Sequence, residues 1–388
     1  MIVAIEPLTD TSSGDFLSFY YAARAIHQHL DLYDPSTLIN LSRADGLTTQ
    51  VYPYLYPPVL AQLLQPLAAL PINIARGVWL GILLLAVAVS SIPVLVTTVP
   101  AATDTHETRS RFVNRLLLTL ICTTLIPVRN NLAMGQVNLL VVALLALTVA
   151  SYFTHRPLLA GTFLAVATLI KATPIVFVGF FLARRAFKVV KALIVASVLI
   201  IAMSLGFGGV IPWRQYLSHA PSYGFTRDIP GLFPAAITFN FSPLGALSRV
   251  APRELAASTA IGISICALLI ALVLAVRARD KYQERTSLSL FPIAMLFASP
   301  LTYLHHVAYL AISAIVWLPV IIKRRHWTTL AAVVLVLGIA GIDWPALYDR
   351  LGPLFGRQEY QAINLYAIVV LYGMIIVEYQ RRDQVLGS

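Results

Sequence analysis

Charged residues are scarce in this chain. Of its 388 residues, 12% are charged and 58% are hydrophobic, whereas a soluble globular domain carries about 25% charged residues. A chain with half the usual charge cannot cover a soluble surface of this size. The composition excludes a disordered chain and a coiled coil, and it predicts an all-α polytopic membrane protein.

Recognisable soluble chemistry is also lacking. The two cysteines, Cys122 and Cys266, lie in apolar runs, which excludes a secreted disulfide scaffold and a cysteine metal site. The sequence contains no DxD acidic pair, GxGxxG, P-loop or HExxH motif. Without a DxD pair, a divalent cation holding a diphosphate has no evident ligands. We therefore predict no metal and no cofactor.

Long apolar runs predict the membrane crossings, each of which needs roughly 20 residues. The run 286–299 is short, and 158–183 is interrupted by Lys171 and Pro174. Proline disrupts a helix and a buried ammonium is costly, so two short helices meeting near Lys171 are predicted there. About 11 crossings follow, in one domain over 1–388. The eight clear runs are 74–99, 112–128, 136–153, 189–211, 255–276, 303–322, 327–342 and 360–379.

Basic clusters predict the orientation. The net charge of +11 could suggest a nucleic-acid partner, but 17 of the 28 Lys and Arg residues lie in short loops between apolar runs. This is the positive-inside pattern, so a plasma-membrane protein without a nucleic-acid partner is predicted. The N-terminus, the loop 14–53 and the loop 212–254 would then lie outside. The clusters are Arg109/Arg111/Arg115, Arg156, Arg184/Arg185/Lys188/Lys191, Arg277/Arg279/Lys281/Arg285, Lys323/Arg324/Arg325 and Arg381/Arg382.

This orientation requires that 54–70 does not cross. An interfacial or re-entrant helix is predicted, and the alternative, in which 54–70 spans, breaks the charge rule at every later loop. An outer N-terminus without a signal peptide is best explained by a further helix before Met1, which would make twelve crossings. The polar and helix-breaking residues of this run and its end are Pro57, Pro58, Gln62, Gln65, Pro66 and Pro71.

Acidic residues gather in the loops predicted to be outside, and none lies in the middle of a crossing. This weighs against an ion-coupled transporter and favours a site at the outer boundary. Asp15 precedes a predicted interfacial helix whose apolar positions recur at helical spacing from Phe16. Asp15 is interpreted as a helix N-cap or as a general base for a sugar hydroxyl, and one residue could serve as both.

Three further polar groups flank apolar runs. Gln136 and Asn138, with Asn130, Asn131 and Gly135, form a capped turn or bind sugar hydroxyls. Lys171 either snorkels to the interface or holds a phosphate. His305 and His306 point about 100° apart on a helix, so a metal pair is disfavoured and one histidine donating to a phosphate or sugar oxygen is plausible.

These residues stand in strings that resemble glycosyltransferase family 87, membrane enzymes of the GT-C class. The strings are GDFLSFYYAARAIHQHLDLYDP, YLYPPVLAQLLQPLAALP, MGQVNLL, ATLIKATP and SPLTYLHHVAYL. They occur in the family's order and cover most of the chain from 14 to about 310. The last 70 residues match only in hydropathy.

The resemblance implies a GT-C fold and transfer of a hexose, with mannose as the expected sugar, from a polyprenyl-phosphate donor. The acceptor would be a glycolipid or lipid-linked glycan at the outer face, and the reaction would be inverting and metal-independent. The family's acidic residue of the first outer loop corresponds to Asp15, the catalytic base. Its remaining positions correspond to substrate-binding residues, namely Gln136, Asn138, Lys171, His305 and His306.

Two rival functions remain open. A lipid or solute transporter would need a polar path, and the crossings consist mainly of Leu, Ala, Val and Ile. An oligosaccharide ligase or polymerase of the same class would use a diphosphate-linked donor and would transfer a block instead of one sugar.

Overall fold

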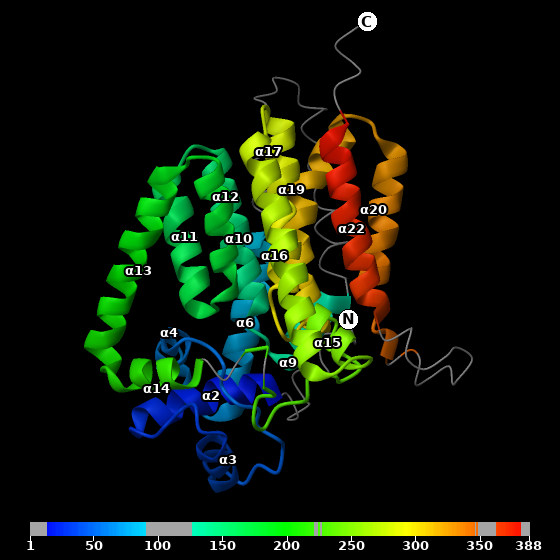
Figure 1. Cartoon of the computed structure of the whole chain (residues 1–388). Coiled ribbons are helices and arrows are strands. Elements are labelled where there is room, and N and C mark those ends of the chain that lie inside the picture. Colours follow the sequence, from blue (N-terminus) through cyan, green and yellow to red (C-terminus); the bar gives the residue numbers. More distant parts are fainter. Residues whose placement is uncertain are drawn as a thin grey trace, which may run out of the picture.

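All regular elements that the structure describes are helices (Figure 1). The computed structural model describes residues 14–90, 126–220, 224–225, 227–345, 347 and 362–381. Within these residues, four helices are long and apolar enough to cross a membrane, which agrees with the predicted all-α membrane class; the total of about 11 crossings stays a prediction. The four are α6 (Ile72–Ser90), α13 (Phe187–Gly208), α16 (Arg253–Arg277) and α22 (Ile363–Gln380).

The apolar run 158–183 is broken at the lysine, as predicted. Helix α11 (Pro157–Ile170) ends before Lys171, and the 3₁₀ turn η2 (Thr173–Val176) leads into α12 (Phe177–Ala183). Pro174 lies in the first turn of η2, where its missing N–H costs no helical hydrogen bond. Other short apolar helices are α10 (Asn138–Phe153), η4 (Leu304–Tyr309) continuing into α19 (Leu310–Lys323), and α20 (Trp327–Ala340).

Two other apolar runs, 286–299 and 54–70, are each divided between two short helices. The run 286–299 is divided between α17 (Lys281–Leu288) and α18 (Phe291–Phe297), because Pro292 begins a new helix. The run 54–70 forms α4 (Pro58–Leu63) and α5 (Gln65–Ala68). At about 1.5 Å per residue, neither can cross a bilayer. This removes the alternative of one spanning helix at 54–70, while the interfacial placement stays a prediction.

Part of the predicted pattern lies outside the described residues. Helix α6 ends at Ser90 and α9 (Ile126–Met134) is the next described element. The basic cluster at 109–115 and most of the run 112–128 therefore fall outside the described residues.

Short helices gather at one end of the bundle. Figure 1 shows α2 (Gly14–His27), α3 (Pro35–Ala44), α14 (Ile211–His219) and α15 (Pro243–Ser248) at its lower end with α4. The start of α17 and the end of α22 lie at the upper end, where the described basic clusters also occur. The two ends of the bundle thus differ in both structure and charge.

Small residues let the long helices approach closely. A Cβ added to Gly161 of α11 would lie 2.4 Å from the Val189 backbone oxygen of α13. In α16, a stripe of small buried residues recurs every three or four positions. Such spacing is typical of helix packing in membranes, where no hydrophobic effect drives helices together. The stripe consists of Ala256, Ala260, Ser264, Ala267, Ala271 and Ala275.

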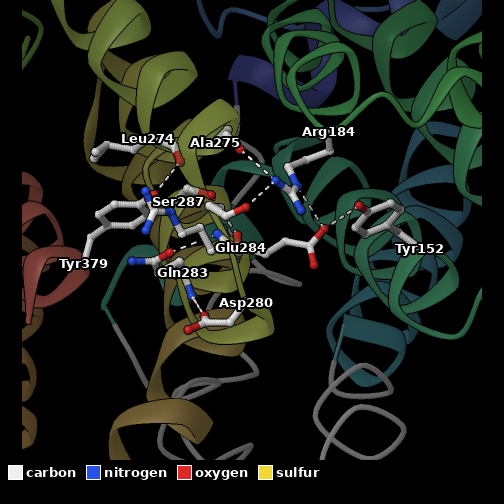
Figure 2. A network of polar contacts seen from close by, with 11 residues as sticks. Tyr152, Arg184, Leu274, Ala275, Asp280, Gln283, Glu284, Ser287 and Tyr379 are labelled. Atoms are coloured by element: carbon white, nitrogen blue, oxygen red, sulfur yellow. Dashed lines mark hydrogen bonds and ion pairs between the residues drawn. The ribbon is translucent and has the colours of Figure 1, made fainter. Parts of the chain in front are cut away.

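A polar network ties the helices together at the upper end (Figure 2). The Arg184 guanidinium donates to the backbone oxygens of Ala275 and Ala278, at 3.1 and 2.8 Å, and contacts Glu284 Oε1 at 3.3 Å. The Tyr152 hydroxyl donates to the same Glu284 oxygen at 2.6 Å. Helices α10, α12, α16 and α17 are thereby joined far from the lower end.

Candidate active site

Asp15 lies in the first turn of α2, because this helix begins at Gly14. The N-cap position is therefore one residue or more before Asp15, and the N-cap interpretation of Asp15 is wrong. A carboxylate in a first turn is still stabilised by the helix dipole. Helix α2 is buried on all sides and not only along one apolar face, because Phe16 to Ala23 are all buried. The helix is thus held as a rigid element that fixes where Asp15 stands.

Gly135 allows α2 to approach the turn before α10. Its φ is +65°, and a Cβ built on it would lie 2.7 Å from the Phe16 Cβ. The Trp79 indole N–H donates to the Gly135 oxygen at 2.7 Å, and the Trp79 ring stacks on Phe16 with centroids 6.5 Å apart. Glycine is required here both by the backbone conformation and by the close contact.

We expect Gly135→Ala to destabilise the protein and to reduce its activity together. A left-handed residue other than glycine costs about 1–2 kcal/mol, and the added methyl group must also push Phe16 and the neighbouring Asp15 away. Thermal unfolding in detergent and a transfer assay measure the two effects. Gly77→Ala, at a helical position with nothing within 4 Å of the new Cβ, is the control and should be neutral. Wild-type stability and activity of Gly135→Ala would contradict the assigned role of this turn.

Gln136 connects Asp15 to an aromatic residue. Its side chain is buried, and its Oε1 accepts a hydrogen bond from the Tyr56 hydroxyl at 3.2 Å. The Gln136 amide also lies close enough to the Asp15 carboxyl to lower its pKa. Since Oε1 is used as an acceptor, the NH₂ group is the one that serves Asp15.

Asn138 receives two hydrogen bonds at the start of α10. Its Oδ1 accepts from Lys171 Nζ and from the Tyr309 hydroxyl, both at 2.7 Å. The amide nitrogen Nδ2 is buried and makes no hydrogen bond to any described residue. A buried donor without a partner is costly. Asn138 therefore keeps one donor available for a bound molecule.

Lys171 caps the end of α11 in an extended conformation. Its ammonium lies 5.6 Å from the Tyr56 ring centroid and 5.7 Å from that of Tyr309, within the range of cation–π attraction. Its charge also acts on Asp15. Lys171 is therefore held by specific partners, which the snorkelling interpretation does not require.

His305 and His306 lie in η4, with ring centroids 4.3 Å apart. The two rings therefore lie side by side, whereas side chains pointing about 100° apart on a helix were predicted to diverge. His306 Nδ1 accepts from the Tyr303 backbone N–H at 2.9 Å, so neutral His306 carries its proton on Nε2. The charge of Lys171 acts on both histidines. The structure does not single out one of them as the partner of a phosphate.

Asn131 has a structural role. Its Nδ2 donates to the backbone oxygens of Pro127 and His305, both at 2.7 Å, and thereby joins α9 to η4. The sugar-binding alternative for Asn131 would have to rely on its Oδ1, which is buried and has no described partner. Asn130 is only partly buried.

Sequence reasoning missed Tyr56 and Tyr309, which bracket Lys171. Tyr309 stands three residues after His306 on the same helical turn, and Tyr56 belongs to the YLYPP string. A tyrosine among apolar residues is usually core or interface. These two tyrosines differ from ordinary core tyrosines only because their hydroxyls contact predicted site residues.

The surroundings of Asp15 set its protonation. Burial raises the pKa of Asp15 to about 6, while the hydrogen bond from Gln136 and the charge of Lys171 act in the opposite direction. A carboxyl whose pKa lies near neutral pH is suited to general acid–base chemistry. No group of three or more His, Cys, Asp or Glu side chains that could hold a metal occurs among the described residues; metal independence stays a prediction.

Comparison with known proteins places this chain in a family. The profile of glycosyltransferase family 87 matches residues 54–301, which include Gln136, Asn138 and Lys171 but neither Asp15 nor the histidine pair. Curated mycobacterial proteins also match, and the matched region spans about two thirds of their length.

One similar protein is a polyprenol-phosphate-mannose-dependent alpha-(1-2)-phosphatidylinositol pentamannoside mannosyltransferase of Mycobacterium tuberculosis, 24% identical over 80% of this chain and 69% of its own. Another from that species is a polyprenol-phosphate-mannose-dependent alpha-(1-2)-phosphatidylinositol mannoside mannosyltransferase, 26% identical over 75% of this chain and 66% of its own. A pentamannoside mannosyltransferase of Mycolicibacterium smegmatis is 28% identical over 73% and 65%. Because the family profile covers well over half of the sequence, the chain belongs to glycosyltransferase family 87.

Proposed function

We propose that the protein is an integral-membrane mannosyltransferase. Its donor is polyprenol-phosphate-mannose, and its acceptor is a glycolipid of the phosphatidylinositol-mannoside type. The proposal is carried by one observation: Asp15, Gln136, Asn138 and Lys171, which come from three separate parts of the chain, are linked through hydrogen bonding and charge. Family membership and the names of the similar proteins supply the sugar, the donor and the acceptor.

In this reaction Asp15 accepts the proton of the acceptor hydroxyl. The hydroxyl oxygen attacks the anomeric carbon of mannose from the face opposite the phosphate, and the carbon–oxygen bond to the phosphate breaks. One new glycosidic bond replaces the sugar–phosphate bond, and configuration at the anomeric carbon is inverted. A positioned general base typically contributes about 10²–10⁴-fold to the rate.

Charge on the departing polyprenyl phosphate increases as its bond to the sugar breaks. Lys171 supplies a positive charge for that phosphate, and the unused Nδ2 of Asn138 supplies a hydrogen-bond donor. The proton on His306 Nε2 offers a second donor for a phosphate or pyranose oxygen. A departing polyprenyl monophosphate needs less neutralisation than a diphosphate, so this chemistry proceeds without a metal.

The reacting side is the extracytoplasmic face of the plasma membrane. The positive-inside rule places clustered Lys and Arg in the cytoplasm. The described clusters lie at the upper end in Figure 1, while α2, which carries Asp15, lies at the lower end. Cysteine labelling at positions in α3 with a membrane-impermeant reagent tests this orientation.

Membranes containing the protein are incubated with radiolabelled polyprenol-phosphate-mannose and phosphatidylinositol-mannoside acceptors. We expect a labelled lipid longer by one mannose, identified by mass spectrometry. Addition of an oligosaccharide block would indicate a ligase or polymerase. Absence of any donor consumption by active, detergent-purified protein, together with movement of the donor between leaflets in vesicles, would favour a flippase instead.

A further inference from the structure

A small pocket is lined by the segment that follows α14 together with Leu244, Arg253, Pro300 and Leu301. It is a shallow depression that is partly open to solvent, and the roughly 230 Å³ of space along its lining includes open solvent. Its polar and aromatic lining consists of Arg227, Asp228, Phe233 and Arg253.

Asp228 is held in place by one of its two carboxylate oxygens. Oδ1 accepts from the Ala235 backbone N–H at 2.9 Å and from the Arg253 guanidinium at 2.8 Å. Oδ2 makes no hydrogen bond within the described part of the chain, and the exposed Arg227 guanidinium has no described partner either. A fixed acceptor and a neighbouring donor match a sugar hydroxyl, which both donates and accepts.

A row of partly exposed aromatic rings leads away from this pocket. Phe233, which lines the pocket, lies 5.7 Å from the Tyr52 ring and 4.9 Å from the Phe239 ring, measured between centroids. The Phe239 ring in turn lies 5.5 Å from that of Tyr303. Aromatic faces present an apolar, electron-rich surface on which the C–H face of a pyranose ring can pack.

The row ends near the proposed base. Tyr303 lies within electrostatic reach of both Asp15 and Asp228, and the charge of Asp15 also acts on Tyr52. The Tyr303 hydroxyl is buried and makes no hydrogen bond to any described residue. A polar group without a partner at this point is available to a bound hydroxyl group. Ring contacts thus run from the pocket to two tyrosines on which the charge of Asp15 acts.

We propose that this pocket and its aromatic row are the subsite for the carbohydrate head group of the acceptor. The inference rests on the proposed function. The row extends beyond one ring, so we assign it two sugar units: one over the rings next to Asp15, with its hydroxyl toward that carboxylate, and one against the open face of the pocket, where Asp228 and Arg227 lie. Recognition of this kind selects acceptors by the length of their glycan.

The variants Arg227→Ala and Phe233→Ala test the subsite. Loss of one hydrogen bond to a charged group, as in Arg227→Ala, or of one aromatic packing contact, as in Phe233→Ala, corresponds to about tenfold weaker binding. For each variant we expect the acceptor KM to rise about tenfold for an acceptor with two or more mannose units, with the donor KM unchanged. For a one-mannose acceptor, which cannot reach both regions, the acceptor KM should change much less. Direct binding of α-linked mannobiose to the detergent-solubilised protein, followed by saturation-transfer NMR, should weaken in the same variants.

Matched controls separate this inference from its alternatives. Arg43→Ala removes an exposed arginine from α3, and Phe207→Ala removes a phenylalanine that is 90% exposed at the end of α13. Neither should change acceptor KM. Equal loss with all acceptors, or loss in Phe207→Ala as well, would identify the aromatic row as a membrane anchor and overturn the subsite. Unchanged mannobiose binding in Arg227→Ala and Phe233→Ala would overturn it too. If the wild-type protein binds mannobiose at this pocket but transfers no mannose, the proposed function fails and the subsite stands.

Discussion

Replacement of Asp15 by asparagine is expected to abolish mannosyl transfer while the protein still inserts and folds. The amide preserves the size of the side chain and can still hydrogen-bond Gln136, but it cannot accept the proton of the acceptor hydroxyl. A loss of at least 10²-fold in kcat follows from the usual contribution of a general base. Rates are measured with purified protein and labelled donor. Glu254→Gln, which neutralises an exposed carboxylate in the first turn of α16, should be as active as the wild type.

The raised pKa of Asp15 adds two checks. Only the ionised carboxylate is a base, so wild-type kcat/KM should rise with pH through about 6. Stability moves the other way. The pKa of Asp15 is about 6 in the folded protein and 3.8 in the unfolded chain, so the folded protein holds the proton more tightly. This proton binding stabilises the fold fully below about pH 3.8, and the stabilisation is lost as pH rises through about 6. Asp15→Asn should therefore match or exceed the wild-type Tm at pH 7.5. A clear fall in Tm would show that Asp15 is structural, and wild-type-like turnover would remove it from the mechanism.

Replacement of Lys171 by alanine has the second-largest expected effect. Removal of one preorganised group that stabilises developing charge typically costs about 10²–10³-fold in rate. The loss should fall mainly on kcat and on use of the donor, because the ammonium serves the phosphate. Kinetics with donor and acceptor varied separately measure this. Lys171→Arg keeps the charge and should recover part of the activity. Equal losses toward donor and acceptor would indicate a merely structural lysine.

The pH profile distinguishes the electrostatic role of Lys171 from a packing role. The Lys171 charge lowers the pKa of Asp15 against the larger effect of burial. In Lys171→Met the pKa of Asp15 should therefore rise further, and the acidic limb of kcat/KM should move to higher pH. Lys171→Arg should leave this limb in place. An unshifted limb in Lys171→Met would mean that the lysine and the carboxylate do not act in one site.

Local signals in the sequence predicted several elements well. The apolar runs predicted long helices such as α13 and α16, because hydrophobic length is a property of the chain alone. The break at Lys171 was also predictable, since Pro174 and a buried ammonium both oppose one straight helix. The division of 286–299 was missed because the length of an apolar run does not show where one helix ends and the next begins. Here Pro292 sets the start of a new helix.

The candidate site was predictable as a set of residues but not as an arrangement. Gln136, Asn138 and Lys171 stood out because polar groups next to apolar runs are unusual. Tyr56 and Tyr309 did not stand out, since a tyrosine in an apolar context is ordinary. Asn131 stood out equally, yet its amide serves to join α9 to η4. Polarity in a sequence shows that a group needs a partner and does not show whether the partner is protein or ligand.

Composition and hydropathy by themselves determined that this chain is helical and built for a membrane, because a 12% share of charged residues cannot solvate a surface of this size. Tertiary structure alone decided which side chains meet. Asp15 reaches Gln136 only because Gly135 adopts a positive φ and leaves room for Phe16, and Lys171 reaches Asn138 only through the packing of α10 against α11. Such contacts depend on residues far apart in the sequence, and their burial sets the charge state on which the proposed chemistry depends.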